Sequence, residues 1–135
     1  MKRRQGFVSN SSSSSFIIAI PKKFNVEEQR KNNLVLDYIF DSYEDQEAKK
    51  VDKEEDITVD FISTGTDTRE EYYVNKDGTF TETYLNYLKE CKNYLKRGYY
   101  LMTVYGSSDG DVISRGISCG IHDDLPSEIK VVSLS

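Results

Sequence analysis

Phe16-Ile17-Ile18-Ala19-Ile20 is the stretch that decides the fold, because it is a short, continuous apolar run that ends at a proline. Its length and its β-branched residues are typical of a buried strand. Pro21 ends the run because it has no backbone N–H to donate to a neighbouring strand. The sequence therefore predicts a strand over residues 16–20, with Phe16 as the first residue of the folded domain.

A polar leader precedes this strand. Residues 1–15 carry Lys2, Arg3 and Arg4 against no acidic residue, and residues 11–15 are all serine. Serine and asparagine side chains favour local hydrogen bonds to the backbone over a helix or a strand ladder. We therefore expect residues 1–15 to form a flexible, basic, Ser-rich leader and residues 16–135 to form a single α+β domain.

The leader resembles the N-terminus of a loose set of uncharacterised proteins from bacteriophages and other bacterial mobile elements. The shared residues are a basic start, then Gly6-Phe7-Val8-Ser9-Asn10, the five serines and Phe16. The resemblance covers residues 1–18 and none of the body. It implies a viral or mobile-element origin and a leader that acts as a transferable tag on unrelated bodies. It implies no catalytic activity.

Three interpretations of the leader remain open. As a linker, the serines only tether Phe7, Val8 and the basic tip. As a recognition segment, Phe7 and Phe16 dock on a partner while the basic tip meets an acidic rim. As a modification site, the hydroxyls accept a phosphate or another group, which would invert the charge of the leader. The candidate partner-binding residues in this segment are Arg3, Arg4, Gly6, Phe7, Val8 and Asn10.

The composition indicates one globular domain with many aromatic residues. A chain of 135 residues is long enough for an autonomous core, and 37% of its residues are hydrophobic. Ten tyrosines and six phenylalanines are present without any tryptophan. Tyrosine at this density is typical of contact surfaces as well as of cores.

The charge is distributed unevenly along the chain. The net charge is −5, but residues 1–15 carry +3 and residues 41–56 carry −5. No broad basic face for nucleic acid is therefore expected, and only the leader has the charge to contact phosphates.

The acidic segment, residues 41–56, has two interpretations. Its acidic and basic side chains can pair three or four residues apart along a solvated helix, and such charge runs usually serve solubility. Alternatively, it forms an acidic surface that imitates nucleic-acid phosphates and occupies a basic site on a host protein. Glu44, Asp45 and Glu47 are the candidate binding residues of that surface.

The remaining patterns predict two helices and several strands. One helix begins at Val26 after the cap Asn25 and runs to the mid-forties; a second begins after Thr79 or Thr81 and stops at Gly98. Strands are expected over residues 57–62, 70–74, 99–105, 111–119 and 128–134, with a turn at 75–78. This order predicts an α+β fold: a mostly antiparallel sheet of four to six strands with the two helices packed on one face.

Cys119 and His122, followed by two aspartates, form the one place where a thiol, an imidazole and carboxylates come together in the sequence. A structural zinc site needs four ligands, and a nucleophile and its base are rarely so close in sequence. The chain has no phosphate-binding glycine loop, no G-x-S-x-G and no H-E-x-x-H. We expect no catalytic residue, no metal and no cofactor, with a small enzyme that uses Cys119 and His122 as a distant alternative.

These observations favour a non-enzymatic accessory protein that binds a host or viral protein through an acidic or Tyr-rich surface, with inhibition as one outcome. The alternative is a virion-associated component whose leader is a packaging or processing tag. Two cysteines without a secretory context, and no apolar run long enough to cross a membrane, predict a location in the host cytoplasm or in the virion.

Overall fold

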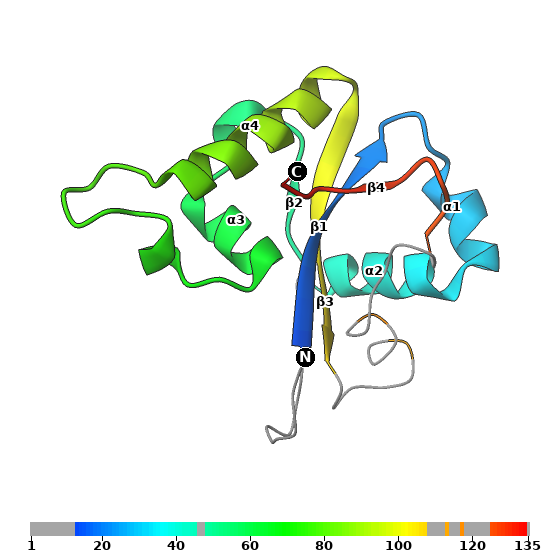
Figure 1. The fold of residues 1–135 in the computed structure, drawn as a ribbon. Helices are drawn as coiled ribbons and strands as arrows, with labels where there is room; N and C mark the ends of the chain where they lie inside the picture. Colours follow the sequence, from blue (N-terminus) through cyan, green and yellow to red (C-terminus); the bar gives the residue numbers. More distant parts are fainter. Residues whose placement is uncertain (1–12, 46–47, 108–112, 114–116, 118–124, 135) are drawn as a thin grey trace.

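The structure, a computed structural model, describes residues 13–45, 48–107, 113, 117 and 125–134. Within these residues it has the predicted α+β fold, with an antiparallel sheet of four strands in the order β2-β3-β1-β4 and four α-helices (Figure 1). The two long strands, β1 (Ser13–Pro21) and β3 (Tyr99–Ser107), form the centre of the sheet. In the described part of the chain, no helix is both long enough and apolar enough to cross a membrane.

The central strand pair extends beyond its two neighbours. β1 and β3 pair along their whole length, from Ser13 opposite Ser107 to Pro21 opposite Tyr99. The outer strands β2 (Lys50–Val51) and β4 (Lys130–Val131) are only two residues long and pair with the middle of β3 and β1, respectively. One end of the central pair therefore projects past both outer strands.

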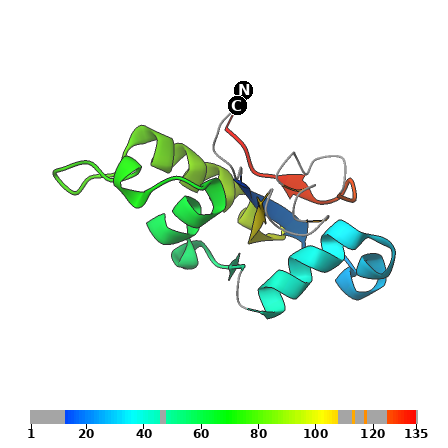
Figure 2. The ribbon, with the colours of Figure 1, turned by 90° about the horizontal axis from the view of Figure 1, so that it is seen from below.

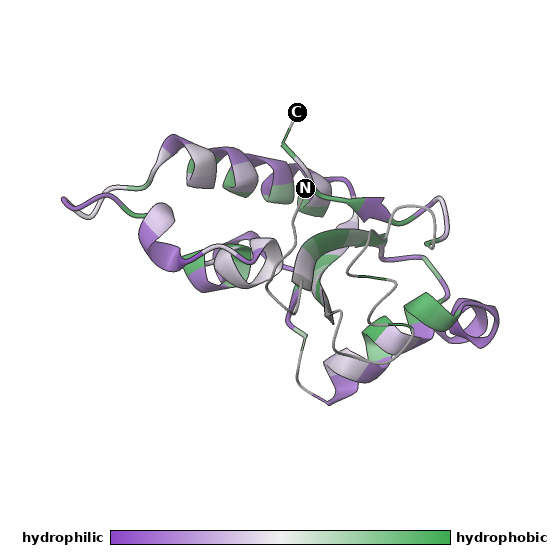
Figure 3. Ribbon diagram, turned by 60° about the horizontal axis from the view of Figure 1, so that its bottom comes forward, coloured by the Kyte–Doolittle hydropathy of each residue, from purple (hydrophilic) through white to green (hydrophobic). Residues whose placement is uncertain are grey.

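Helices cover both faces of this sheet (Figure 2). Ile17 and Ala19 face α3 (Val59–Thr66) and α4 (Glu82–Lys96), whereas Ile18 and Ile20 face α2 (Leu34–Glu44). Successive side chains of a strand point to opposite faces, so a strand with helices on both sides is apolar without interruption. Figure 3 shows this apolar centre of the sheet between the helices.

The expectation that the two predicted helices pack on one face is not confirmed. Leu36 and Ile39 of α2 pack with Ile18 on one side of the sheet, while Tyr84 and Cys91 of α4 pack with Ile17 on the other. The second helix on the face of α4 is α3, which the sequence did not predict.

The segment predicted as one helix from Val26 to the mid-forties is divided. α1 (Val26–Gln29) has the predicted cap, because the side chain of Asn25 accepts a hydrogen bond of 3.1 Å from the backbone N–H of Glu28. A 3-10 turn over Arg30–Asn32 follows, and α2 begins anew at Leu34. Asn33 causes the break: its backbone is extended, and its side chain caps α2.

The strand predicted over residues 57–62 is wrong, because Val59–Thr66 forms α3. The Thr58 hydroxyl accepts a 3.1 Å hydrogen bond from the N–H of Phe61 and so caps the helix. Phe61, Ile62 and Gly65 are buried, which is a helical spacing. α3 ends at Asp67, which has a φ of 53°.

The strand expected over residues 70–74 is also wrong, except for one bridge. Glu70–Tyr72 is a 3-10 turn, and only Val74 pairs, with Phe80. The turn at 75–78 is confirmed, with Gly78 at a φ of 89°. The second helix is confirmed as α4, which Thr81 caps and which is followed by Gly98 at a φ of 90°.

The remaining strand predictions are confirmed in part. Residues 99–105 lie in β3, and of residues 128–134 only Lys130–Val131 form a strand. Most of the predicted strand 111–119 lies outside the described residues; within it, Ile113 and Ile117 have helical backbones and pack against the α2 side of the core. β1 begins at Ser13, three residues before the expected start of the domain at Phe16.

Candidate functional site

The candidate site lies where β3 continues past the end of β2. The N–H of Thr103 donates to the carbonyl of Lys49 at 2.9 Å, which directs the backbone groups of Thr103 away from β1. In an antiparallel ladder this direction alternates from residue to residue. Tyr105 is two residues after Thr103, so its N–H and C=O also point away from β1. Among the described residues, no strand pairs with β3 on that side beyond Thr103. Tyr105 therefore lies at a strand edge with which no other described strand pairs, and its carbonyl accepts a 3.5 Å hydrogen bond from the hydroxyl of Tyr38.

A cavity of about 610 Å³ surrounds this edge. We call it the β3-edge groove. Its residues come from both central strands, from the segment before β2, from α2, and from α3 with the loop that follows it. They are Ser15, Tyr38, Ile39, Ser42, Ala48, Ser63, Thr64, Asp67, Thr68, Arg69, Thr103, Val104 and Tyr105.

The two sides of the β3-edge groove differ in chemistry. Ile39 and Val104 are buried at 1% and 3% exposure and form an apolar side below α2. On the α3 side, most lining residues carry hydroxyl groups: Ser15, Ser63, Thr64, Thr68 and Thr103. A strand added to β3 would therefore meet an apolar side and a hydroxyl side with alternate side chains.

Hydrogen bonds hold the hydroxyl side in place. The hydroxyl of Ser63 donates to the carbonyl of Thr68, and the hydroxyl of Thr103 accepts a 2.9 Å hydrogen bond from the N–H of Lys49. Thr66, one turn along α3, contacts the hydroxyl of Tyr73 at 2.6 Å and so joins the end of α3 to the next segment. The lining is thus positioned by the fold before any ligand binds.

The described residues of the lining carry no net formal charge. Its charged residues are Asp67 and Arg69, and the guanidinium of Arg69 lies 3.2 Å from Glu71 in an exposed ion pair. A neutral, polar ligand therefore matches the β3-edge groove better than an anion or a nucleic acid, which require positive charge.

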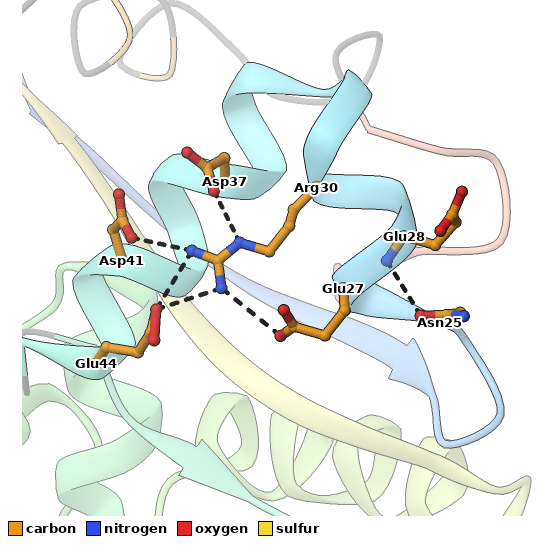
Figure 4. A network of polar contacts seen from close by, with 7 residues as sticks. All are labelled: Asn25, Glu27, Glu28, Arg30, Asp37, Asp41 and Glu44. Carbon is orange, nitrogen blue, oxygen red and sulfur yellow. Dashed lines mark hydrogen bonds and ion pairs between the residues drawn. The ribbon is translucent and has the colours of Figure 1, made fainter.

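Two acidic residues of the predicted acidic segment, Asp41 and Glu44, belong to an ion-pair network around Arg30 (Figure 4). The side chain of Arg30 is only 14% exposed and lies 2.7 Å from Asp37, 2.9 Å from Asp41 and 3.2 Å from Glu44. The hydrogen bond to Asp37 is the main reason why the pKa of Arg30 is raised. Of the predicted residues, Glu44 is thus bound to Arg30, Asp45 ends α2, and Glu47 lies outside the described residues.

The other predicted site residues lie outside the described part of the chain. These are Arg3, Arg4, Gly6, Phe7, Val8, Asn10, Cys119 and His122. In the described residues, no group of three or more histidine, cysteine, aspartate or glutamate side chains is placed to hold a metal ion. The described cysteine, Cys91, is buried in the core, and burial raises the pKa of its thiol to about 12. Cys91 is therefore protonated near neutral pH and is a poor nucleophile.

Sequence reasoning missed the β3-edge groove. Its hydroxyl side depends on α3, which the alternating pattern of residues 57–62 concealed. The Thr58 cap was the signal that would have indicated a helix there. Two of the ten tyrosines, Tyr38 and Tyr105, line the groove.

Comparisons with known proteins give no match. No protein-family model matches the chain, and the searches of curated proteins and of solved structures found no match.

Proposed function

We propose that this protein is a non-enzymatic accessory protein, of the phage type that its leader resembles, which binds a host or viral protein. The bound segment of the partner is extended and adds to the sheet beside Tyr105. The observation that supports this proposal is that the edge of β3 at Tyr105, with which no other described strand pairs, lies in a cavity. The host cytoplasm is the expected place of binding.

Strand addition suits the shape and chemistry of the β3-edge groove. In this binding mode the backbone hydrogen bonds supply affinity, and pockets for alternate side chains supply specificity. The volume of about 610 Å³ lies in the usual range for ligand sites, roughly 300 to 1,000 Å³. The rings of Tyr38 and Tyr105 add the aromatic contact area that protein interfaces favour.

The acidic surface around Glu44 is less suitable for this role. Asp41 and Glu44 already pair with Arg30, so part of their negative charge is neutralised before a basic partner binds. Breaking an ion pair in order to make another gains little net energy. We therefore assign partner binding to the β3-edge groove rather than to the end of α2.

The test is peptide selection against the full chain, followed by a blocking substitution. Peptides selected from a displayed library of random linear sequences are titrated against the unmodified protein, Thr64→Tyr and Thr83→Tyr. Thr64 is an exposed residue that lines the groove, and Thr83 is an exposed helical threonine outside the lining. We expect Thr64→Tyr to weaken binding by about tenfold or more, or about 1.4 kcal/mol, and Thr83→Tyr to leave it unchanged.

Equal binding to both variants, with melting temperatures like that of the unmodified protein, would place the binding surface elsewhere. The next candidate would then be the exposed apolar side chains of Tyr72, Phe80 and Leu85, which are 64%, 46% and 47% exposed.

The resemblance of the leader favours a second candidate function, a virion-associated component with the leader as a packaging or processing tag. A deletion that tests this function should remove residues 2–12, because β1 begins at Ser13. Capture of partners from phage-infected cells is then compared between the full chain and the deletion. If the groove binds the partner, capture persists without the leader and is lost in Thr64→Tyr. If the leader is a tag, capture is lost on deletion alone.

A further inference from the structure

We propose that the β3-edge groove selects a partner segment with a glutamine opposite Tyr105, and that the hydroxyl of Thr103 is the donor that recognises this side chain. The inference rests on the proposed function, because it requires an extended segment that pairs with β3 at Tyr105. It adds the chemical class of residue that the partner carries at that position. The orientation of β3, the hydrogen bonds of Thr103 and the charges around the groove support it.

The orientation of β3 decides which side of the groove the partner's side chain meets. A Cβ atom built on Gly65 of α3 would lie 3.3 Å from the methyl carbon of Thr103, so Thr103 faces α3. Tyr105 is two residues further along β3 and faces the same way. Residues that lie opposite each other on paired strands share a face of the sheet. The partner residue opposite Tyr105 therefore meets the hydroxyl side, and its neighbours meet the apolar side with Ile39 and Val104.

Thr103 holds a buried donor in this groove. The residue is 3% exposed, and its hydroxyl accepts a 2.9 Å hydrogen bond from the N–H of Lys49. Because Lys49 leads into β2, the hydroxyl points to the side of β3 on which the partner segment would lie. A hydroxyl also donates one hydrogen bond, and no group in the described part of the chain accepts one from Thr103. Buried donors are nearly always paired, so this hydroxyl offers a bound segment a place for an acceptor atom.

The distance across the strands favours a long side chain. Residues on adjacent strands that are offset by two positions lie about 7 to 8 Å apart, which only long side chains span. Thr103 has this offset from the partner residue opposite Tyr105. The side chains of serine, threonine and asparagine are shorter than that of glutamine. The amide oxygen of glutamine can accept from Thr103, while its NH₂ group donates to the hydroxyl oxygen of Ser63 or Thr64 in the lining.

A charged side chain is less suitable at this position. The nearby cations already have partners, because Lys49 contacts Asp60 and Arg69 lies 3.2 Å from Glu71. Asp67 also lines the groove and would repel a glutamate. Lysine and arginine carry only donors, so they cannot accept from the buried hydroxyl. Glutamine is neutral and has both a donor and an acceptor.

The experiment uses the peptides selected from the displayed library, which we expect to share a glutamine with an apolar neighbour. Each peptide is titrated with its glutamine intact, with methionine in its place, which has a similar length and no amide, and with glutamate. The glutamine peptide should bind the unmodified protein about tenfold more tightly than either replacement.

Variants of Thr103 test which group makes this distinction. Thr103→Val keeps the shape but removes the hydroxyl, so it should bind the glutamine and methionine peptides equally. Thr103→Ser keeps the hydroxyl and should retain the preference of about tenfold. Thr83→Val, at the exposed position outside the lining, is the matched control and should behave like the unmodified protein.

NMR places the contact without any variant. In the complex of the unmodified protein we expect nuclear Overhauser effects between the side-chain amide protons of the glutamine and the methyl group of Thr103. This measurement decides the role of Thr103 even if Thr103→Val, which removes the acceptor of the Lys49 N–H, does not fold.

The outcomes separate this inference from the proposed function. Peptides that Thr64→Tyr weakens, but that share no glutamine or bind as tightly with methionine, overturn the preference for glutamine and leave the proposed function standing. A preference that persists in Thr103→Val, or no Overhauser effect to the Thr103 methyl group, overturns the role of Thr103. Peptides that Thr64→Tyr does not weaken overturn the proposed function and this inference together.

Discussion

Gly65 is the residue at which α3 comes closest to the sheet. A Cβ atom at this position would overlap Cγ1 of Ile17 and lie 2.9 Å from its Cδ1 and 3.3 Å from Cγ2 of Thr103. Ile17 is buried at 2% exposure and has little room to move. Gly65→Ala gains about 1 kcal/mol in helix propensity but overfills the core, so we expect a net loss of about 2 kcal/mol in the free energy of unfolding. Urea denaturation measures this loss.

Two further variants make that measurement specific. Thr64→Ala changes the adjacent, exposed helix position and should leave stability within about 0.5 kcal/mol of the unmodified protein. In a double-mutant cycle with Ile17→Ala, the cost of Gly65→Ala should shrink, because the clashing atoms are gone. A cost that stays the same in the Ile17→Ala background would contradict the close contact.

Cys91 gives a prediction about pH and reactivity. Burial, and to a lesser extent the charge of Glu90, raises the pKa of its thiol from 9.0 to about 12. In Cys119→Ser, which leaves Cys91 as the remaining thiol, we expect reaction with a disulfide reagent to be very slow near neutral pH and fast in denaturant. Because the folded pKa is the higher one, this group stabilises the fold fully below about pH 9, and the contribution is lost as the pH rises toward 12. Rapid reaction in the native state would contradict the burial.

At the scale of elements, Arg30 joins α1 to α2. Arg30→Ala removes its contacts with Asp37, Asp41 and Glu44 and leaves these carboxylates to repel one another. We expect a loss of about 1 to 2 kcal/mol in urea denaturation, smaller at high salt because the repulsion is screened. Arg69→Ala is the matched control. Both side chains of the Arg69–Glu71 ion pair are exposed, so the loss in the free energy of unfolding should be near zero. Equal losses in both variants would contradict the role of the network.

The elements also show which sequence signals can be trusted. Thr81 and Gly98 bound α4 as predicted, because caps depend on local hydrogen bonding and on backbone conformation alone. At Ile57, Val59 and Phe61 the apolar alternation suggested a strand, yet a helix is formed. A segment of six residues is too short to distinguish the periodicity of a strand from that of a helix. Packing against the sheet therefore decides which of the two forms.

At the scale of the whole molecule, the sequence predicted the fold class but not the layers. The continuous run Ile17 to Ile20 reflects helices on both faces of β1, but the run alone does not say which helix covers which face. The β3-edge groove could not be predicted from the sequence for a related reason. Ser15, Ser42, Thr64 and Tyr105 are far apart in sequence and meet only because β2 ends early.

The central claim is that an extended segment binds beside Tyr105, and amide exchange measured by NMR tests it most directly. A library-selected peptide is added at saturation to the full chain, and exchange rates are compared with those of the free protein. The proposed strand addition predicts that the amide of Tyr105 becomes strongly protected from hydrogen exchange. It also predicts that the largest chemical-shift changes lie in the β3-edge groove, at Ser42, Thr64 and Val104. No added protection at Tyr105, with the largest changes at Tyr72, Phe80 and Leu85 instead, would contradict the claim.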